Sequence, residues 1–186
     1  MRLIVGISGA SGVIMGYRLL QALRQHPGME THLVVSEGAF RIFEVETDIP
    51  FETVKEAADY NYDNNNLSAL ISSGSFVTDG MIVMPCSMKT LSGVAQGYSD
   101  NLLIRAVDVC LKEGRKVVLV PREMPFSRVH IHNLQKAAEF GCAVVPPMLT
   151  FYNHLDSAEE QVQHVIGKVL MQFGLEHKEF VPWRGI

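Results

Sequence analysis

The chain has 186 residues, close to the usual size of one domain, and its 47% apolar and 19% charged residues are an ordinary globular composition. A formal net charge of −4 argues against binding of nucleic acid, which needs a surplus of Lys and Arg. We find no apolar run long enough to span a bilayer and no signal-peptide pattern, so we expect a cytoplasmic protein. The three scattered cysteines, Cys86, Cys110 and Cys142, argue against disulfides and a structural zinc, and we expect no metal.

Strand and helix patterns alternate along the chain. The β-branched run Arg2–Ile7 predicts a buried strand, and apolar residues at helical spacing predict a helix over 12–23 that ends before Pro27 and Gly28. Similar patterns then predict a strand at Thr31–Ser36, a helix at 37–46, a loop at Asp59–Asn66, a strand at Gly80–Pro85, a helix at Asn101–Glu113, and strands at Lys116–Pro121 and Ala143–Pro146. A capping box of Ser157 and Glu160 predicts the start of the last helix.

This alternation predicts a doubly wound α/β fold. The strands are apolar on both faces, which is typical of a mostly parallel sheet with helices on both sides, a flavodoxin-like or Rossmann-like three-layer arrangement. We expect a single domain over 1–186, because the sequence contains neither an internal repeat nor a linker. In such folds ligands bind at the carboxyl ends of the strands, near a topological switch point.

Small, hydroxyl-bearing and cationic residues follow several of the predicted strands. The first strand leads into Ser8-Gly9-Ala10-Ser11-Gly12, and a helix N-terminus after such a loop favours an anion. This loop alone is weak evidence, since a tight turn also needs small residues and the spacing is not that of a dinucleotide or P-loop motif. Further along, Ser36, the run Pro85-Cys86-Ser87-Met88-Lys89-Thr90, and Pro121-Arg122-Glu123 stand at strand ends. Together these loops favour a phosphorylated cofactor or substrate.

Several multi-residue motifs then add up to a family resemblance: "GISGASG", "PCSMKTLSG", "RAVDVCLKE", "LVPREMPFS" and "PPMLTFYN". The chain resembles the UbiX-like flavin prenyltransferases, including relatives known as the small subunits of hydroxyarylic acid decarboxylases, from Arg2 to Trp183. The resemblance implies an enzyme that joins a dimethylallyl group from dimethylallyl phosphate to N5 and C6 of reduced FMN, without a metal. It also implies that the prenylated FMN serves a separate UbiD-like decarboxylase, and that the enzyme is a homo-oligomer, a dodecamer.

The resemblance also implies a set of site residues. The FMN site falls on Gly9, Ala10, Ser11, Ser36, Ser87, Met88, Lys89, Thr90 and Arg122. The dimethylallyl phosphate site falls on Tyr152 and Lys168, with Arg105, Lys112 and Glu123 nearby and contributed across a subunit interface, and with Trp183 in a tail, 174–186, that closes over the site. Lys168 departs from relatives that carry Arg at this position, and Lys offers a compact charge in place of a bidentate fork.

Three residues are the catalytic candidates. Ser11 supplies a hydroxyl between cofactor and prenyl phosphate, Glu46 matches a carboxylate that removes the C6 proton, and Glu123 beside Arg122 is placed to pass a proton to the departing phosphate. Two other functions stay open on the residues: a flavin-dependent cysteine decarboxylase, which typically has "PASANT" where this chain has "PCSMKT", and a non-catalytic flavin-binding accessory protein of a decarboxylase. Lys89 in place of that Asn favours an anionic partner.

Overall fold

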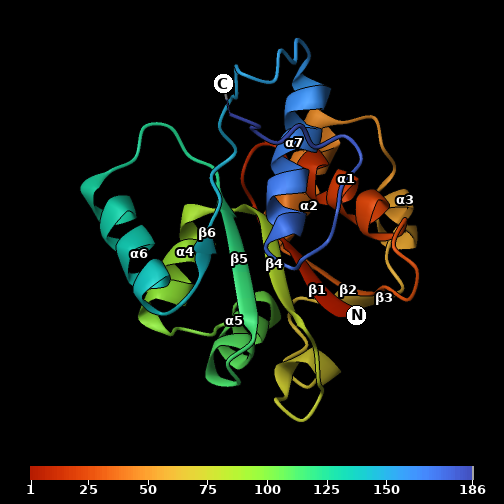
Figure 1. The fold of residues 1–186 in the computed structure, drawn as a ribbon. Coiled ribbons are helices and arrows are strands. Elements are labelled where there is room, and N and C mark those ends of the chain that lie inside the picture. The colour runs from red at the N-terminus through yellow and green to blue at the C-terminus, as the bar shows by residue number, and fades with distance from the viewer. Residues whose placement is uncertain (186) are drawn as a thin grey trace.

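A six-stranded sheet lies between two layers of helices in the computed structural model, which describes residues 1–185 (Figure 1). The strands are β1 (Arg2–Ile7), β2 (Glu30–Val35), β3 (Tyr60–Asp63), β4 (Gly80–Cys86), β5 (Lys116–Pro121) and β6 (Ala143–Val144). The helices are α1 (Ile14–Leu23), α2 (Glu37–Glu46), α3 (Phe51–Glu56), α4 (Met88–Gln96), α5 (Leu102–Lys112), α6 (Arg128–Glu139) and α7 (Ala158–Met171), with a 3-10 turn, η1, at Leu70–Ser72. The doubly wound α/β fold predicted from the sequence is therefore confirmed.

The strand order places a switch point in the middle of the sheet. All pairs are parallel in the order β3-β2-β1-β4-β5-β6, so the chain winds outward from β1 to β3 and then returns to β4 on the other side of β1. The loops that leave the carboxyl ends of β1 and β4 therefore diverge above neighbouring strands. This is the position at which open α/β sheets bind their ligands.

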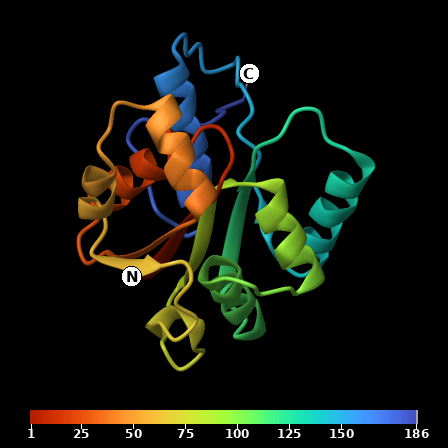
Figure 2. The ribbon, with the colours of Figure 1, turned by 180° about the vertical axis from the view of Figure 1, so that it is seen from behind.

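Each face of the sheet has its own apolar core. On one face Leu3, Val5 and Ile7 of β1 pack in the same cluster as residues of α1, α2, α3 and α7. Because side chains alternate along a strand, Ile4 points the other way, into a cluster formed with α4, α5 and residues near η1. Figure 2 shows the molecule from behind, with the two helical layers on either side of the sheet. The interior strands are buried on both faces, which explains why they are apolar throughout.

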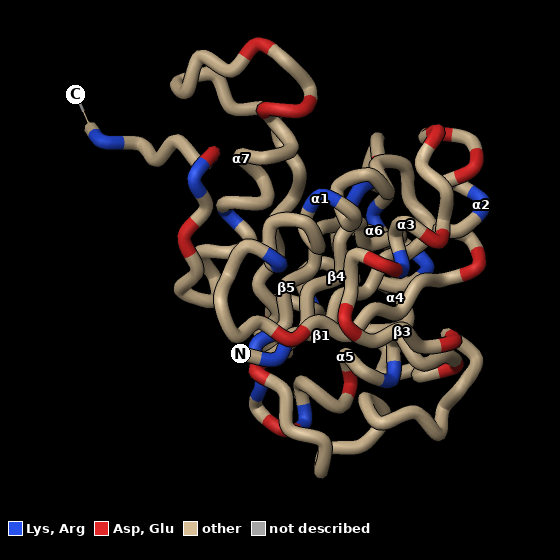
Figure 3. The backbone as a smooth tube through the Cα atoms, turned by 90° about the vertical axis from the view of Figure 1, so that its right-hand side faces the viewer, with Lys and Arg blue, Asp and Glu red and all other residues tan. Residues whose placement is uncertain are grey.

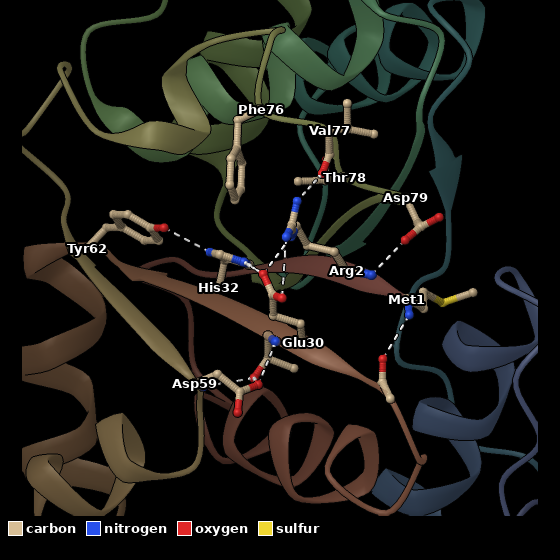
Figure 4. A network of polar contacts seen from close by, with 12 residues as sticks. Met1, Arg2, Glu30, His32, Asp59, Tyr62, Phe76, Val77, Thr78 and Asp79 are labelled. Carbon is tan, nitrogen blue, oxygen red and sulfur yellow. Dashed lines mark hydrogen bonds and ion pairs between the residues drawn. The ribbon is translucent and has the colours of Figure 1, made fainter.

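The prediction of a loop at Asp59–Asn66 is wrong in part, because Tyr60–Asp63 forms β3 at one edge of the sheet. The side chains of β3 are polar, and a network of polar contacts connects this edge of the sheet to buried residues of β2 (Figure 4). His32 on β2 is almost fully buried and contacts Tyr62 of β3 and Glu30, each at 2.8 Å. Glu30 in turn accepts a hydrogen bond of 2.5 Å from Nε of Arg2. Ring stacking of His32 on Tyr60 adds a further contact, with the centroids 4.8 Å apart.

The surface carries charges of both signs. Figure 3 shows acidic and basic positions interspersed along the tube. Within residues 1–185, no helix combines the length and the apolar character that a membrane crossing needs. The same part of the chain has no group of three or more His, Cys, Asp or Glu side chains arranged to hold a metal ion.

Candidate active site

Ser8 connects the two loops at the switch point. It is fully buried at the end of β1, and its hydroxyl accepts a hydrogen bond of 2.7 Å from the Ser87 backbone N–H. The same hydroxyl donates to the Pro85 carbonyl at 3.0 Å, and the Ser8 N–H donates to that carbonyl at 3.1 Å. The loop after β1 is thus fixed to the loop after β4, as expected if both contact one ligand.

Two serines predicted for the cofactor site are helix N-caps. The Ser36 hydroxyl accepts from the Ala39 N–H at the start of α2, and the Ser87 hydroxyl accepts from the Thr90 N–H at the start of α4. Both helices therefore begin at the carboxyl edge of the sheet, where their free N–H groups and dipoles favour an anion. Thr90 is buried behind its helix start, whereas Lys89 is exposed beside it.

The first loop passes close to the start of α2. A Cβ placed on Gly9 would come within 3.1 Å of the Gly38 carbonyl carbon, so two glycines let these backbones approach one another. Glu46, at the last turn of α2, accepts a hydrogen bond of 2.8 Å from the Gly12 N–H. The structure therefore brings the predicted carboxylate Glu46 next to Ser11, whose hydroxyl makes no hydrogen bond to the residues described.

Arg122 and Glu123 follow β5, the next strand along the sheet. The Arg122 N–H donates to the Cys86 carbonyl at 3.2 Å, which places this loop beside the end of β4. Both side chains are exposed, and the Glu123 carboxylate accepts from the Met124 N–H at 2.9 Å. Arg122 therefore adjoins the predicted FMN loops, while the side chains of Arg122 and Glu123 form no ion pair within residues 1–185.

Tyr152, Lys168 and Trp183 gather around the carboxyl-terminal tail. The Tyr152 and Trp183 rings meet edge to face with centroids 5.3 Å apart. Lys168, on α7, holds its Nζ 5.8 Å from the centre of the Phe180 ring. The tail runs back along α7 toward the carboxyl edge of the sheet (Figure 1). Residue 186, the last of the predicted closing tail, lies outside the described residues.

Arg105 and Lys112 lie apart from these groups in one copy of the chain. Arg105 donates to the Ser72 carbonyl at 3.2 Å and pairs with Asp108 at 2.6 Å, and Lys112 pairs with Glu113. Lys112 ends α5, shortly before β5 begins, and therefore lies toward the amino end of the sheet. Within one copy of the chain, the structure therefore does not bring these two cations together with the other predicted site residues.

Two further features are a buried thiol at the end of β4 and a cavity that lies away from the predicted site. Cys86 ends β4 and is fully buried, which raises the pKa of its thiol far above the ordinary range and leaves it protonated. A cavity of about 760 Å³ lies elsewhere, between α1, α7 and the start of the tail, and no predicted site residue lines it.

The sequence prediction missed two aromatic residues of the tail cluster, His164 and Phe180, because neither belongs to a recognisable motif. The available signal was Gly167, a glycine inside α7 that leaves room for another side chain to pack against the helix.

Comparison with known proteins shows the family to which the chain belongs. The model of the Flavoprotein family matches residues 1–174, so the chain is a member of that family. It is 64% identical over 185 residues to a probable UbiX-like flavin prenyltransferase of Sedimentibacter hydroxybenzoicus, a match that covers 100% of this chain and 98% of the relative. Within the flavoproteins, the chain therefore belongs to the UbiX-like flavin prenyltransferases.

Solved structures agree on the fold over the whole chain. A dodecameric FMN-dependent UbiX-like decarboxylase from Escherichia coli O157:H7 superposes with a TM-score of 0.97 at 53% identity, covering 100% of both chains. AnUbiX (PadA1), solved in complex with FMN and dimethylallyl pyrophosphate, superposes with a TM-score of 0.96 at 41% identity, covering 100% of this chain and 98% of the other.

Proposed function

We propose that this protein is a flavin prenyltransferase, which transfers a dimethylallyl group from dimethylallyl phosphate to N5 and C6 of reduced FMN. The observation that carries the proposal is the junction of the β1 and β4 loops through Ser8, with Glu46 held against the first loop. Family membership and the FMN-bound neighbour support it. The product would be released to a UbiD-like decarboxylase, and the enzyme would act as a homo-oligomer, a dodecamer like its neighbour.

The carboxyl edge of the sheet fits FMN. FMN bound there would supply the nucleophilic ring atoms that form the new bonds to the prenyl group. Around it, Ser36 and Ser87 fix the starts of two helices, so their backbone N–H groups are oriented before any anion binds. The remaining cofactor contacts would come from Gly9, Ala10, Ser11, Met88, Lys89, Thr90 and Arg122.

The prenyl donor would bind against the tail. Its phosphate leaves as an anion, so donors that are already oriented lower the barrier, and the Tyr152 hydroxyl and the Lys168 ammonium would fill that role. An allylic cation develops at the same time, and the face of the Trp183 indole attracts positive charge. Arg105 and Lys112 of a neighbouring copy would complete the phosphate site.

Proton transfer would use two carboxylates in different loops. Glu46 is exposed and anchored by the Gly12 N–H, which orients it over the first loop as a base for the C6 proton. Glu123 would return a proton to the departing phosphate. Glu46→Gln should slow closure of the second bond more than formation of the first, and Glu123→Gln should slow phosphate release; a variant with full turnover would remove the role assigned to that residue.

Mass spectrometry of the flavin tests the proposed function. The purified protein is incubated without oxygen with reduced FMN and dimethylallyl phosphate, and in parallel with the diphosphate. We expect a flavin heavier by one prenyl unit that activates an apo-decarboxylase of the UbiD type. Flavin that stays bound but unmodified with both donors would overturn the proposal and favour a non-catalytic flavin carrier or a cysteine decarboxylase.

A further inference from the structure

Phe180 of the tail occupies a notch on the surface of α7. The notch exists because Gly167 has no side chain: a Cβ there would lie 2.4 Å from the Phe180 Cβ. His164 and Lys168, four residues apart and therefore on one face of the helix, border it. The His164 ring stacks on Phe180 with centroids 4.9 Å apart and planes at 28°, and the Lys168 Nζ lies 5.8 Å from the Phe180 ring centre.

The His164 ring also contacts Tyr152. The two rings meet edge to face with centroids 5.9 Å apart and planes at 76°. Tyr152 in turn meets Trp183 at 5.3 Å and 74°. An unbroken series of ring contacts thus runs from Phe180 through His164 and Tyr152 to Trp183. It links α7, the loop after β6 and the end of the tail.

His164 is a buried polar side chain with an unpaired ring nitrogen. It is 3% exposed, and its Nδ1 has no hydrogen-bond partner within residues 1–185. Burial, and then the nearby Lys168 charge, lower the pKa of His164, so the ring stays neutral and stacks without carrying a second cation into the cluster. An aliphatic side chain at this position would avoid the unpaired nitrogen but would offer no flat face to Phe180.

The rest of the tail end is more exposed to solvent. Val181 is 39% exposed and Trp183 is 59% exposed. Phe180 stands three residues before Trp183, a distance the chain spans in about 10 Å when extended. Fixing Phe180 in the notch therefore limits the positions that the Trp183 indole can reach.

We propose that Phe180 and His164 are positioning residues for the prenyl donor, setting Tyr152, Lys168 and Trp183 in place through one anchored ring. The proposal rests on the proposed function, because those three residues are its donor-binding groups. Neither Phe180 nor His164 needs to touch the donor. Their loss should lower kcat/KM for the donor, because Tyr152, Lys168 and Trp183 no longer hold the donor and its departing phosphate in place.

The test uses the full-length protein and two readouts. Trp183 is the single tryptophan of the chain, so its fluorescence and its quenching by acrylamide report the tail directly. In Phe180→Ala we expect faster quenching and a kcat/KM for dimethylallyl phosphate lowered about tenfold, which corresponds to about 1.4 kcal/mol, because the displaced groups no longer hold the donor and its departing phosphate. Phe180→Tyr keeps the ring and should restore both values. Val181→Ala, an exposed neighbour in the same tail, is the matched control and should change neither.

A double variant tests whether the two residues act as one unit. His164→Leu should produce the same two changes, and His164→Leu with Phe180→Ala should be little worse than either alone, because both remove one contact. Additive losses, unchanged quenching in Phe180→Ala, or faster quenching with an unchanged kcat/KM would each overturn the proposal. Wild-type protein that binds FMN but transfers no prenyl group would instead overturn the proposed function and the donor-positioning role with it, while the quenching would still report the tail.

Discussion

Replacing Ser8 with alanine should destabilise the protein and loosen the site at once. Two hydrogen bonds of the hydroxyl disappear, one from the Ser87 N–H at 2.7 Å and one to the Pro85 carbonyl at 3.0 Å. The Pro85 carbonyl still accepts a hydrogen bond from the Ser8 N–H at 3.1 Å, whereas the Ser87 N–H loses its acceptor, the Ser8 hydroxyl. Leaving a buried donor unsatisfied costs about 1–3 kcal/mol; because Ser8 is fully buried and the Ser87 N–H is partly buried, we expect a loss of about 2 kcal/mol.

For a chain of this length, that loss corresponds to a fall in melting temperature of about 4–8 °C. The assay is urea unfolding of FMN-free protein followed by circular dichroism, at one fixed protein concentration because assembly also adds to stability. Ser11→Ala is the control: its hydroxyl makes no hydrogen bond to residues 1–185, so its unfolding free energy should stay within about 0.5 kcal/mol of wild type. A Ser8→Ala protein as stable as that control would refute the reasoning. FMN affinity should fall in Ser8→Ala, because the two loops are no longer held together.

Three further outcomes follow from other parts of the structure. Gly167→Ala should displace Phe180 from α7, so that acrylamide quenches the tryptophan faster. The unfolding free energy should fall by about 1–3 kcal/mol through overpacking and the lost ring contacts, offset by up to about 1 kcal/mol from the better helix former. Unchanged quenching and unchanged stability would contradict the account of the notch. The hydrogen bond from Arg2, and then that from His32, lower the pKa of Glu30 from 4.5 to about 2. The stability that this carboxylate contributes is therefore fully present above pH 4.5 and should be lost as the pH falls toward 2. In a plot of melting temperature against pH, Glu30→Gln should flatten the fall between these two pH values. A thiol reagent at pH 8 should leave the folded protein unlabelled and should label all three cysteines after unfolding. The reason is that burial raises the pKa of each thiol, to about 11 for Cys110 and for Cys142.

The interior of the fold is predictable from the sequence because each central strand has to be apolar on both faces. Arg2–Ile7 and Lys116–Pro121 match the structure at both ends. β3 was missed for the opposite reason: its sequence, YNYD, has the composition of a turn, and it becomes a strand only because β2 offers an edge to pair with and His32 offers a ring to stack on. Such support comes from residues far away in the sequence, which local patterns do not contain.

The candidate site likewise has one part that local patterns predict and another that depends on tertiary packing. Loops after the ends of parallel strands lie at one edge of the sheet, so the pattern places the first loop and Ser87–Thr90 at the same edge. That the two loops are neighbours follows from the pairing of β1 with β4, which the pattern does not contain. The approach of Glu46 to Gly12 depends on how α2 packs back over that loop, and the resemblance, not the pattern, pointed to Glu46. The contact of Phe180 with His164 depends on a tail folding back on a helix, and no periodicity encodes it.

The two edges of the sheet are short. β6 has two residues and β3 has four, while the strands between them have six or seven. Few unpaired backbone groups are therefore presented for another strand to join, which protects the monomer from edge-to-edge aggregation. Copies of this chain that assemble must meet through side chains of helices and loops. Such contacts are set by shape and charge at individual positions, so single surface substitutions can dissociate an assembly while the sheet within each copy remains intact.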